Sequence, residues 1–402
     1  MTKTDHNMSV FHASWNVGAV LFAKGVRTFC YGYLGILLPV YLADLGLSAT
    51  GIGAFVTLTL VGSAALTWGI RVPAERLGPR AALVTLAGLA VVGAVLLLRS
   101  HEPWVIVLAA MVGNVAVGAG ETGPFLSIEQ VVIARAVMPA QRTTVLSLYN
   151  LLGYGAAAGG AATVALGTPA TLFAGFLAAA LIQVVVYASL VVRQAPAASV
   201  APPARGARPW TPVIRKVAAL FALDSFAGGF VLQTLIAYFL HARYGLGLEA
   251  LGRVFFVAQL LTAASLLLAP RLARALGLLP TMVLTHLVSN VFLIGIAVAP
   301  TAAVATALLF ARQLLSQIDV PTRQAWVMSV VPDDEREAAA TTTTLWRTAA
   351  QAVTPFATGW IMQSIALSAP FVLGGALKIL YDLLLWKTFK DLEPHELNPE
   401  ND

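Results

Sequence analysis

Residues 194–212 read QAPAASVAPPARGARPWTP, and they lie almost at the middle of the 402-residue chain. The segment is rich in proline and alanine, a composition typical of a solvated linker. On both sides of it, apolar runs of about 20 residues recur, long enough to cross the hydrocarbon core of a bilayer as helices. The sequence therefore predicts an N-terminal domain at 1–193, a linker at 194–212 and a C-terminal domain at 213–402.

The apolar runs predict an all-α integral membrane protein of twelve transmembrane helices in two pseudo-symmetric six-helix bundles. Only helices and closed barrels satisfy their backbone polar groups in lipid, and runs of this length are helical. The fourth and tenth runs are longer than most, and we expect each to continue past the lipid. The predicted spans are 16–43, 52–71, 81–99, 104–133, 143–165, 170–192, 213–240, 250–270, 278–299, 302–330, 339–365 and 370–389.

The composition excludes a soluble protein. Hydrophobic residues make up 58% of the chain and charged residues 11%, against roughly 25% charged in soluble domains. The net charge of +6 is better explained by basic cytoplasmic loops than by nucleic-acid binding. Cys30 is the single cysteine, so an intrachain disulfide is impossible. The first residues lack an apolar core followed by a cleavage site, so no cleaved signal peptide is predicted.

The distribution of lysine and arginine predicts the orientation. Basic residues gather in the connections on one side of the predicted membrane, whereas the other side holds little beyond Arg99 and Arg243. By the positive-inside rule the basic side is cytoplasmic. We expect a multi-pass protein of the inner membrane whose termini and central linker are cytoplasmic. The cytoplasmic bases are Lys3, Arg71, Arg76, Arg80, Arg135, Arg142, Arg193, Arg205, Arg208, Arg215, Lys216, Arg271, Arg274, Arg336, Lys387 and Lys390.

The connection between the second and third spans reads RVPAERLGPR, residues 71–80. With the span count, the orientation and the linker, it resembles the major facilitator superfamily in a bacterial form. That family usually has G-x-x-x-D-R-x-G-R-R at this position, so Arg71 replaces the first glycine and Glu75 the aspartate. The resemblance implies a solute transporter rather than an enzyme. It also implies that Glu75, Arg76 and Arg80 act as a cytoplasmic gating latch.

Two further motifs bear on the direction of transport. Gly155, Gly159 and Gly160 follow the glycine pattern that exporting members carry in helix 5, without its proline. Packing of small residues between helices explains the same pattern equally well. In helix 4, proton antiporters of the family carry an arginine where this chain has Asn114.

Ionisable side chains lie inside predicted spans 1, 4, 7 and 10, which line the central cavity in the superfamily. Charged groups inside a membrane are costly and tend to be functional. We therefore predict a substrate- or proton-binding site on these four spans. Its predicted members are Arg27, Glu121, Asp224, Asp319 and Arg323, with Glu129 as a gating residue; Lys24 and Arg312 lie on the same spans.

The surroundings of these residues refine the prediction for spans 4 and 10. Glu121 lies among glycines and a proline, which loosen a helix and point to a binding site; an ion pair that locks two helices remains the alternative. Glu129 suits a gate salt bridge, a bond to the 71–80 loop or a site role. Asp319 and Arg323 are four residues apart and can pair, and Pro321 between them predicts a kink.

Spans 7, 9 and 12 carry further ionisable groups. Asp224 needs a partner, for which Arg27 or Arg347 are suitable. Lys378 and Asp382 are spaced as a local i, i+4 structural pair, and the histidine of span 9, at position 286, is expected to be packed and hydrogen-bonded.

Several chemistries have no sequence signature. The chain has no phosphate-binding G-x-x-x-x-G-K-[ST] loop, no His/Cys cluster with metal-ligand spacing and no nucleophile–base constellation. We therefore predict no cofactor, no metal and no nucleic-acid partner, and we expect energy from an ion or solute gradient.

Three functions are to be considered for a chain with these features. The first is a proton-coupled exporter of a small solute, working by alternating access in the bilayer as a monomer. The second is uptake or facilitated transport of an anionic solute held by Arg27, Arg323 and Arg347. The third, a non-transporting receptor or scaffold, is disfavoured because it has no need of buried charges.

Overall fold

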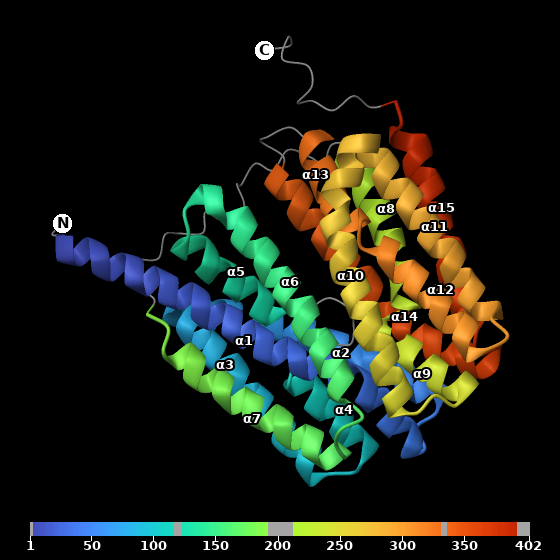
Figure 1. The fold of residues 1–402 in the computed structure, drawn as a ribbon, viewed down its shortest axis with the longest axis horizontal. Coiled ribbons are helices and arrows are strands. Elements are labelled where there is room, and N and C mark those ends of the chain that lie inside the picture. Colours follow the sequence, from blue (N-terminus) through green and yellow to red (C-terminus); the bar gives the residue numbers. More distant parts are fainter. Residues whose placement is uncertain (1–2, 116–122, 192–211, 331–335, 392–402) are drawn as a thin grey trace. The chain divides into compact units, whose positions relative to one another are not determined.

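A computed structural model describes residues 3–115, 123–191, 212–330 and 336–391. Within these ranges all regular secondary structure is α-helical (Figure 1). The helices are α1 (Lys3–Asp44), α2 (Ala49–Gly69), α3 (Arg71–Arg99), α4 (Pro103–Val112), α5 (Pro124–Ala136), α6 (Pro139–Thr163), α7 (Pro169–Ala188), α8 (Pro212–Gly229), α9 (Gln233–Tyr244), α10 (Leu248–Leu276), α11 (Leu278–Val298), α12 (Ala302–Ser316), α13 (Asp319–Val330), α14 (Arg336–Ser364) and α15 (Ala369–Phe389).

The helices form two compact units. The first comprises Met1–Leu47, Leu58–Ala201 and Gly247–Phe256, and the second comprises Ser48–Thr57, Pro202–Leu246 and Val257–Asp402. The unit boundaries therefore cut through α2 and α10. In the first unit α1 packs against both α6 and α7 (Figure 1). In the second, α8 packs against α14 and α15, and α11 against α12 and α15.

Three predicted spans are each built from two shorter helices. Span 4 consists of α4 and α5, span 7 of α8 and α9, and span 10 of α12 and α13. The interruption in span 10 falls at Gln317 and Ile318. It lies one turn before Pro321, whose ring lacks an N–H and clashes with the carbonyl four residues earlier. The kink predicted at this proline is confirmed. The long fourth and tenth runs are thus explained by broken helices.

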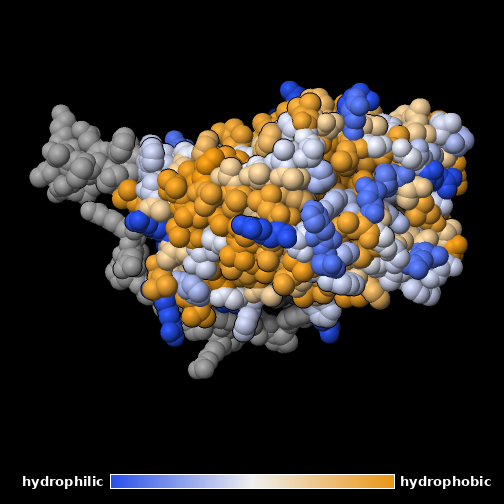
Figure 2. Space-filling model, turned by 90° about the horizontal axis from the view of Figure 1, so that it is seen from below, coloured by the Kyte–Doolittle hydropathy of each residue, from blue (hydrophilic) through white to orange (hydrophobic). Residues whose placement is uncertain are grey.

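Nine spans of the described chain are long and apolar enough to cross a membrane, and α4–α5, α6 and α14 supply the other three crossings. Apolar residues accordingly cover much of the face shown in Figure 2. In α6 and α14 the lower hydropathy reflects small and hydroxylated residues, which let helices approach closely. One such contact joins α6 to α1, where the backbone of Gly160 lies against the carbonyl of Phe29.

Candidate functional site

The second unit contains a buried network of charges around Asp224 of α8. Its Oδ1 accepts a hydrogen bond from Lys378 Nζ of α15 at 2.6 Å. Its Oδ2 accepts one from Arg323 Nη1 of α13 at 3.3 Å. The same Arg323 nitrogen also donates to Asp319 Oδ2 at 2.8 Å, which confirms the predicted i, i+4 pair. One guanidinium is therefore shared by two carboxylates, all of them buried.

A histidine–aspartate pair continues this network into α11 and α15. His286 Nδ1 lies 2.8 Å from Asp382 Oδ1, and Asn290 Nδ2 donates to Asp382 Oδ2 at 3.1 Å. On the other side of the ring, His286 Nε2 lies 3.5 Å from Lys378 Nζ and 3.7 Å from Asp224 Oδ1. A tautomer with the proton on Nδ1 satisfies both sides, since Nδ1–H then donates to Asp382 and Nε2 accepts from Lys378. Polar groups thus run without interruption from Asp319 to Asp382.

Two sequence predictions about this region were wrong. Lys378 and Asp382 do not pair with each other, because Lys378 binds Asp224 and Asp382 binds His286. Asp224 is also not held by the arginines expected for it: Arg347 Nε donates to Ser225 Oγ at 3.0 Å. Same-helix spacing was the only signal that the sequence offered for Lys378 and Asp382.

Arg312 of α12 and Arg347 of α14, both inside membrane spans of this unit, make no ion pair with a described carboxylate. Arg347 makes the bond to Ser225. Arg312 donates from Nη1 to Gln313 Oε1 at 3.0 Å, and its buried Nε has no hydrogen-bond partner in the part of the chain that the structure describes. Asp224 and Asp319 nevertheless lie within electrostatic range of both guanidinium groups.

The first unit holds a buried ion pair between α1 and α5. Arg27 Nη2 donates to Glu129 Oε2 at 2.7 Å and Nη1 donates to Oε1 at 3.2 Å. The hydroxyls of Tyr149 and Tyr187 each donate to the same carboxylate at 2.6 Å. Arg27 is 1% exposed and Glu129 0%. Glu129 therefore accepts four hydrogen bonds and forms its salt bridge with Arg27, and its gating role stays a prediction.

Aromatic rings surround this ion pair. The Arg27 guanidinium lies 4.3 Å from the centre of the Phe125 ring, and Phe125 stacks on Tyr187. Lys24 Nζ lies 4.4 Å from the centre of the Tyr149 ring. Such cation–π contacts are strongest in desolvated sites, so the rings favour a fixed position for both cations.

Glu121 falls within residues 116–122, which lie outside the described residues. The flanking backbone is irregular. Asn114 has φ 50° and Gly123 has φ 116°, and a left-handed conformation is uncommon for a residue other than glycine. Asn114 is buried, and its Oδ1 has no hydrogen-bond partner within the described ranges. Strain and an unsatisfied polar atom together often mark a functional site.

The three predicted latch residues, Glu75, Arg76 and Arg80, are exposed in the first turns of α3. Gly78 between them has φ 87°, a conformation that glycine adopts without strain. No ion pair between described residues involves the three side chains, so their gating role stays a prediction. Among the described residues no group of three His, Cys, Asp or Glu side chains is placed to hold a metal ion.

Comparison with known proteins identifies the family. A profile of the Major Facilitator Superfamily matches residues 20–350. The chain belongs to this superfamily. It is also 23% identical over 413 residues to the uncharacterized membrane protein YJR124C of Saccharomyces cerevisiae, covering 90% of this chain and 91% of the yeast protein. Membership makes the chain a multi-pass membrane transporter rather than an enzyme, as the sequence predicted.

Solved structures show the same fold at low sequence identity. The nucleoside transporter NupG superposes with a TM-score of 0.72 at 13% identity, covering 93% of this chain and 99% of NupG. The human organic anion transporter MFSD10 gives 0.67 at 15% identity over 93% of this chain and 99% of its own. A D-xylose–proton symporter gives 0.68 at 13% identity over 94% and 97%. The predicted fold of twelve helices is confirmed.

Proposed function

We propose that this superfamily member exports a small solute across the inner membrane in exchange for protons, by alternating access. The observation that carries the proposal is the sharing of Arg323 between Asp224 and Asp319. Buried charges in a membrane protein are costly and mark ion or proton pathways. A cation that serves two carboxylates can change partner when one of them takes up a proton.

The two possible protonation events remove different contacts of Arg323. When Asp319 is protonated, the Arg323 guanidinium loses its 2.8 Å ion pair and keeps the 3.3 Å contact to Asp224. When Asp224 is protonated instead, both Arg323 and Lys378 lose a negative partner. His286 contacts Lys378 and Asp382, so it offers the proton a next acceptor within the same network. Protonation of Asp224 thereby loosens the contacts of α8 with α13 and α15, which is the kind of change that a coupled transporter requires.

Residues of the first half complete the proposal. We assign Glu121 a titrating role beside the irregular backbone of Asn114 and Gly123, and Arg27 and Glu129 a buried gate. Export rests on the glycine pattern of helix 5, although Gly160 itself packs on α1. Glu75, Arg76 and Arg80 are assigned the cytoplasmic latch. The protein is proposed to act as a monomer with cytoplasmic termini.

The test is proton flux in everted membrane vesicles, with a pH-sensitive dye and a panel of cationic, neutral and anionic solutes. Solute-triggered collapse of the imposed pH gradient is expected, and Asp224→Asn, Asp319→Asn and Glu121→Gln are each expected to abolish it without loss of folded protein. Glu249→Gln is the matched control, because Glu249 forms an exposed i, i+4 pair with Arg253 on α10. Full coupling in the Asp224 and Asp319 variants would refute the proposal.

A second function keeps a specific observation in its favour. Arg312 and Arg347 make no ion pair with a described carboxylate, although Asp224 and Asp319 lie within electrostatic range of both, so an anionic solute would be the direct partner that each lacks. Arg27 and Arg323 each form ion pairs with carboxylates. Of the three arginines predicted to bind an anion, Arg347 is the one without such an ion pair among the described residues. If labelled anions equilibrate across the membrane without moving protons, and Arg347→Gln stops them, facilitated anion transport is the correct function.

A further inference from the structure

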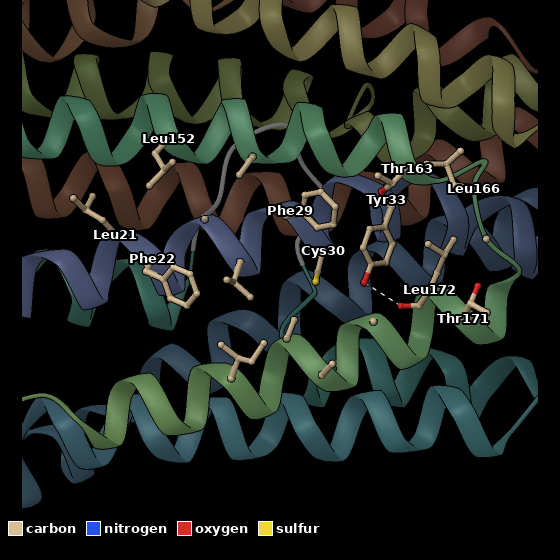
Figure 3. A pocket seen from close by; sticks show the side chains of 18 residues that line it. Leu21, Phe22, Phe29, Cys30, Tyr33, Leu152, Thr163, Leu166, Thr171 and Leu172 are labelled. Carbon is tan, nitrogen blue, oxygen red and sulfur yellow. Dashed lines mark hydrogen bonds between the residues drawn. The ribbon is translucent and has the colours of Figure 1, made fainter.

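The first unit carries a groove that the transport proposal does not use. It encloses about 870 Å³ between α1, α6 and α7 (Figure 3). Every described residue that lines it belongs to these three helices or to the connection between α6 and α7. A volume of this size falls within the range of small-molecule sites in proteins.

The lining excludes a polar ligand. Nearly all of the groove surface is apolar, and its side-chain polar groups are Cys30, Tyr33, Thr163 and Thr171. The Tyr33 hydroxyl donates to the carbonyl of Leu172 at 3.0 Å, drawn as a dashed line in Figure 3. Both threonine hydroxyls donate to carbonyls three residues earlier in their own segments, each at 2.8 Å. The hydroxyl protons are therefore engaged, and what remains is a hydrocarbon surface with one weakly polar thiol.

The rim of the groove is apolar and exposed. Phe22 is 54% exposed, Ile182 44% and Leu152 36%. On membrane-spanning helices such side chains contact acyl chains, because no other apolar solvent surrounds them. The groove is thus continuous with the lipid-facing surface of the first unit.

The groove is long enough for an extended acyl chain. Along α1 it runs from Leu21 to Tyr33, about 18 Å at the helical rise of 1.5 Å per residue. It follows the helix axis, and this length is somewhat more than half of a hydrocarbon core of about 30 Å. Gly25 and Gly175 deepen it. A Cβ at either position would make only ordinary contacts, at 3.9 Å to Leu152 and 3.6 Å to Tyr33 Oη, so helix packing does not require glycine there.

We propose that this groove is a lipid site, in which one acyl chain of a membrane phospholipid lies along α1 between α6 and α7. The chain replaces the side chains that Gly25 and Gly175 lack, and it fills the space that α1 leaves between its two neighbours. The site is separate from the buried Arg27–Glu129 pair, and it does not depend on which solute is transported.

The experiment uses the full-length protein in nanodiscs that contain phosphatidylethanolamine with a diazirine in one acyl chain. After illumination, crosslinks are mapped by peptide mass spectrometry. They are expected to concentrate on groove residues such as Phe22, Cys30 and Ile182. In Ala178→Phe, which places a ring in the groove, the crosslinking of these residues is expected to fall several-fold. Ala174→Phe is the matched control, because Ala174 is exposed on the same helix but does not line the groove.

Each outcome decides the proposal. Crosslinks spread evenly over the lipid-facing helices, or unchanged in Ala178→Phe, would overturn it. Displacement of the crosslinks by a transported solute, and not by unlabelled phospholipid, would also overturn it and would make the groove a solute site. If Ala178→Phe does not fold, Gly25→Leu fills the groove from α1, and the map on the unchanged protein stands by itself.

Discussion

The ion pair between Arg27 and Glu129 allows a quantitative test of how the first bundle is held together. We consider Arg27→Ala, Glu129→Ala and the double variant. Removing Glu129 deprives Arg27 of the carboxylate that takes two of its hydrogen bonds, and it removes the acceptor of two tyrosine hydroxyls. Removing Arg27 leaves a carboxylate at 0% exposure with the tyrosines alone.

The size of the effect follows from this geometry. Breaking a buried pair by removing one partner costs about 3–5 kcal/mol, because a charge is left without compensation in a medium of low dielectric constant. For Glu129→Ala, each tyrosine hydroxyl that loses its acceptor adds about 1–3 kcal/mol. The double variant avoids the stranded charge, so its loss should fall short of the sum of the single losses by about 3 kcal/mol.

The measurement is reversible unfolding in mixed detergent micelles, followed by circular dichroism, for all four proteins of the cycle. The exposed pair Glu249–Arg253, with side chains 71% and 73% exposed, supplies the control cycle. There a coupling of no more than about 1 kcal/mol is expected. If the single variants at Arg27 and Glu129 keep wild-type stability and their effects are additive in the cycle, the ion pair does not stabilise the first bundle. Loss of solute flux in such stable variants would place Arg27 in the solute site.

Two further predictions concern other contacts. His286→Gln keeps a donor for Asp382 and is expected to fold but to lose proton coupling in vesicles, whereas His286→Leu should also lose about 1–3 kcal/mol of stability, because it removes one hydrogen-bond donor from a buried carboxylate. Equal proton flux in His286→Gln and the unchanged protein would contradict the first part. Gly160→Ala places a Cβ against the Phe29 carbonyl and is expected to cost about 1–3 kcal/mol by overpacking. Gly155→Ala meets nothing within 4 Å and should be neutral or more stable by up to about 1 kcal/mol; equal thermal stability of these two variants would argue against the α1–α6 contact.

Local features of the structure were predictable from the sequence, because their causes lie within one helix. The spacing of Asp319 and Arg323 predicted their ion pair, and Pro321 predicted the interruption between α12 and α13. Span lengths and the basic loops were sufficient for the twelve-helix fold.

Contacts between helices were not predictable in the same way. Arg27 and Glu129 are 102 positions apart, and Asp224 and Lys378 are 154 apart. No spacing rule relates residues at such separations. The sequence therefore predicted Asp382, the nearest acid on the same helix, as the partner of Lys378. The polar character of spans 9 and 12 was visible in the sequence, but its connection to Asp224 depends on helix packing. Similarly, no proline lies at the interruption between α8 and α9, which follows Gly229, so the sequence did not predict it.

The break in span 10 makes that crossing two short rods joined at a pivot. Asp319 and Arg323 lie on the same rod, α13, so a tilt of α13 moves them together and leaves their 2.8 Å contact intact. Asp224 lies on α8, so the same tilt changes the 3.3 Å contact from Arg323 to Asp224. Of the two ion pairs that Arg323 makes, only the longer one therefore registers a movement of α13, and its length reports the angle of the pivot.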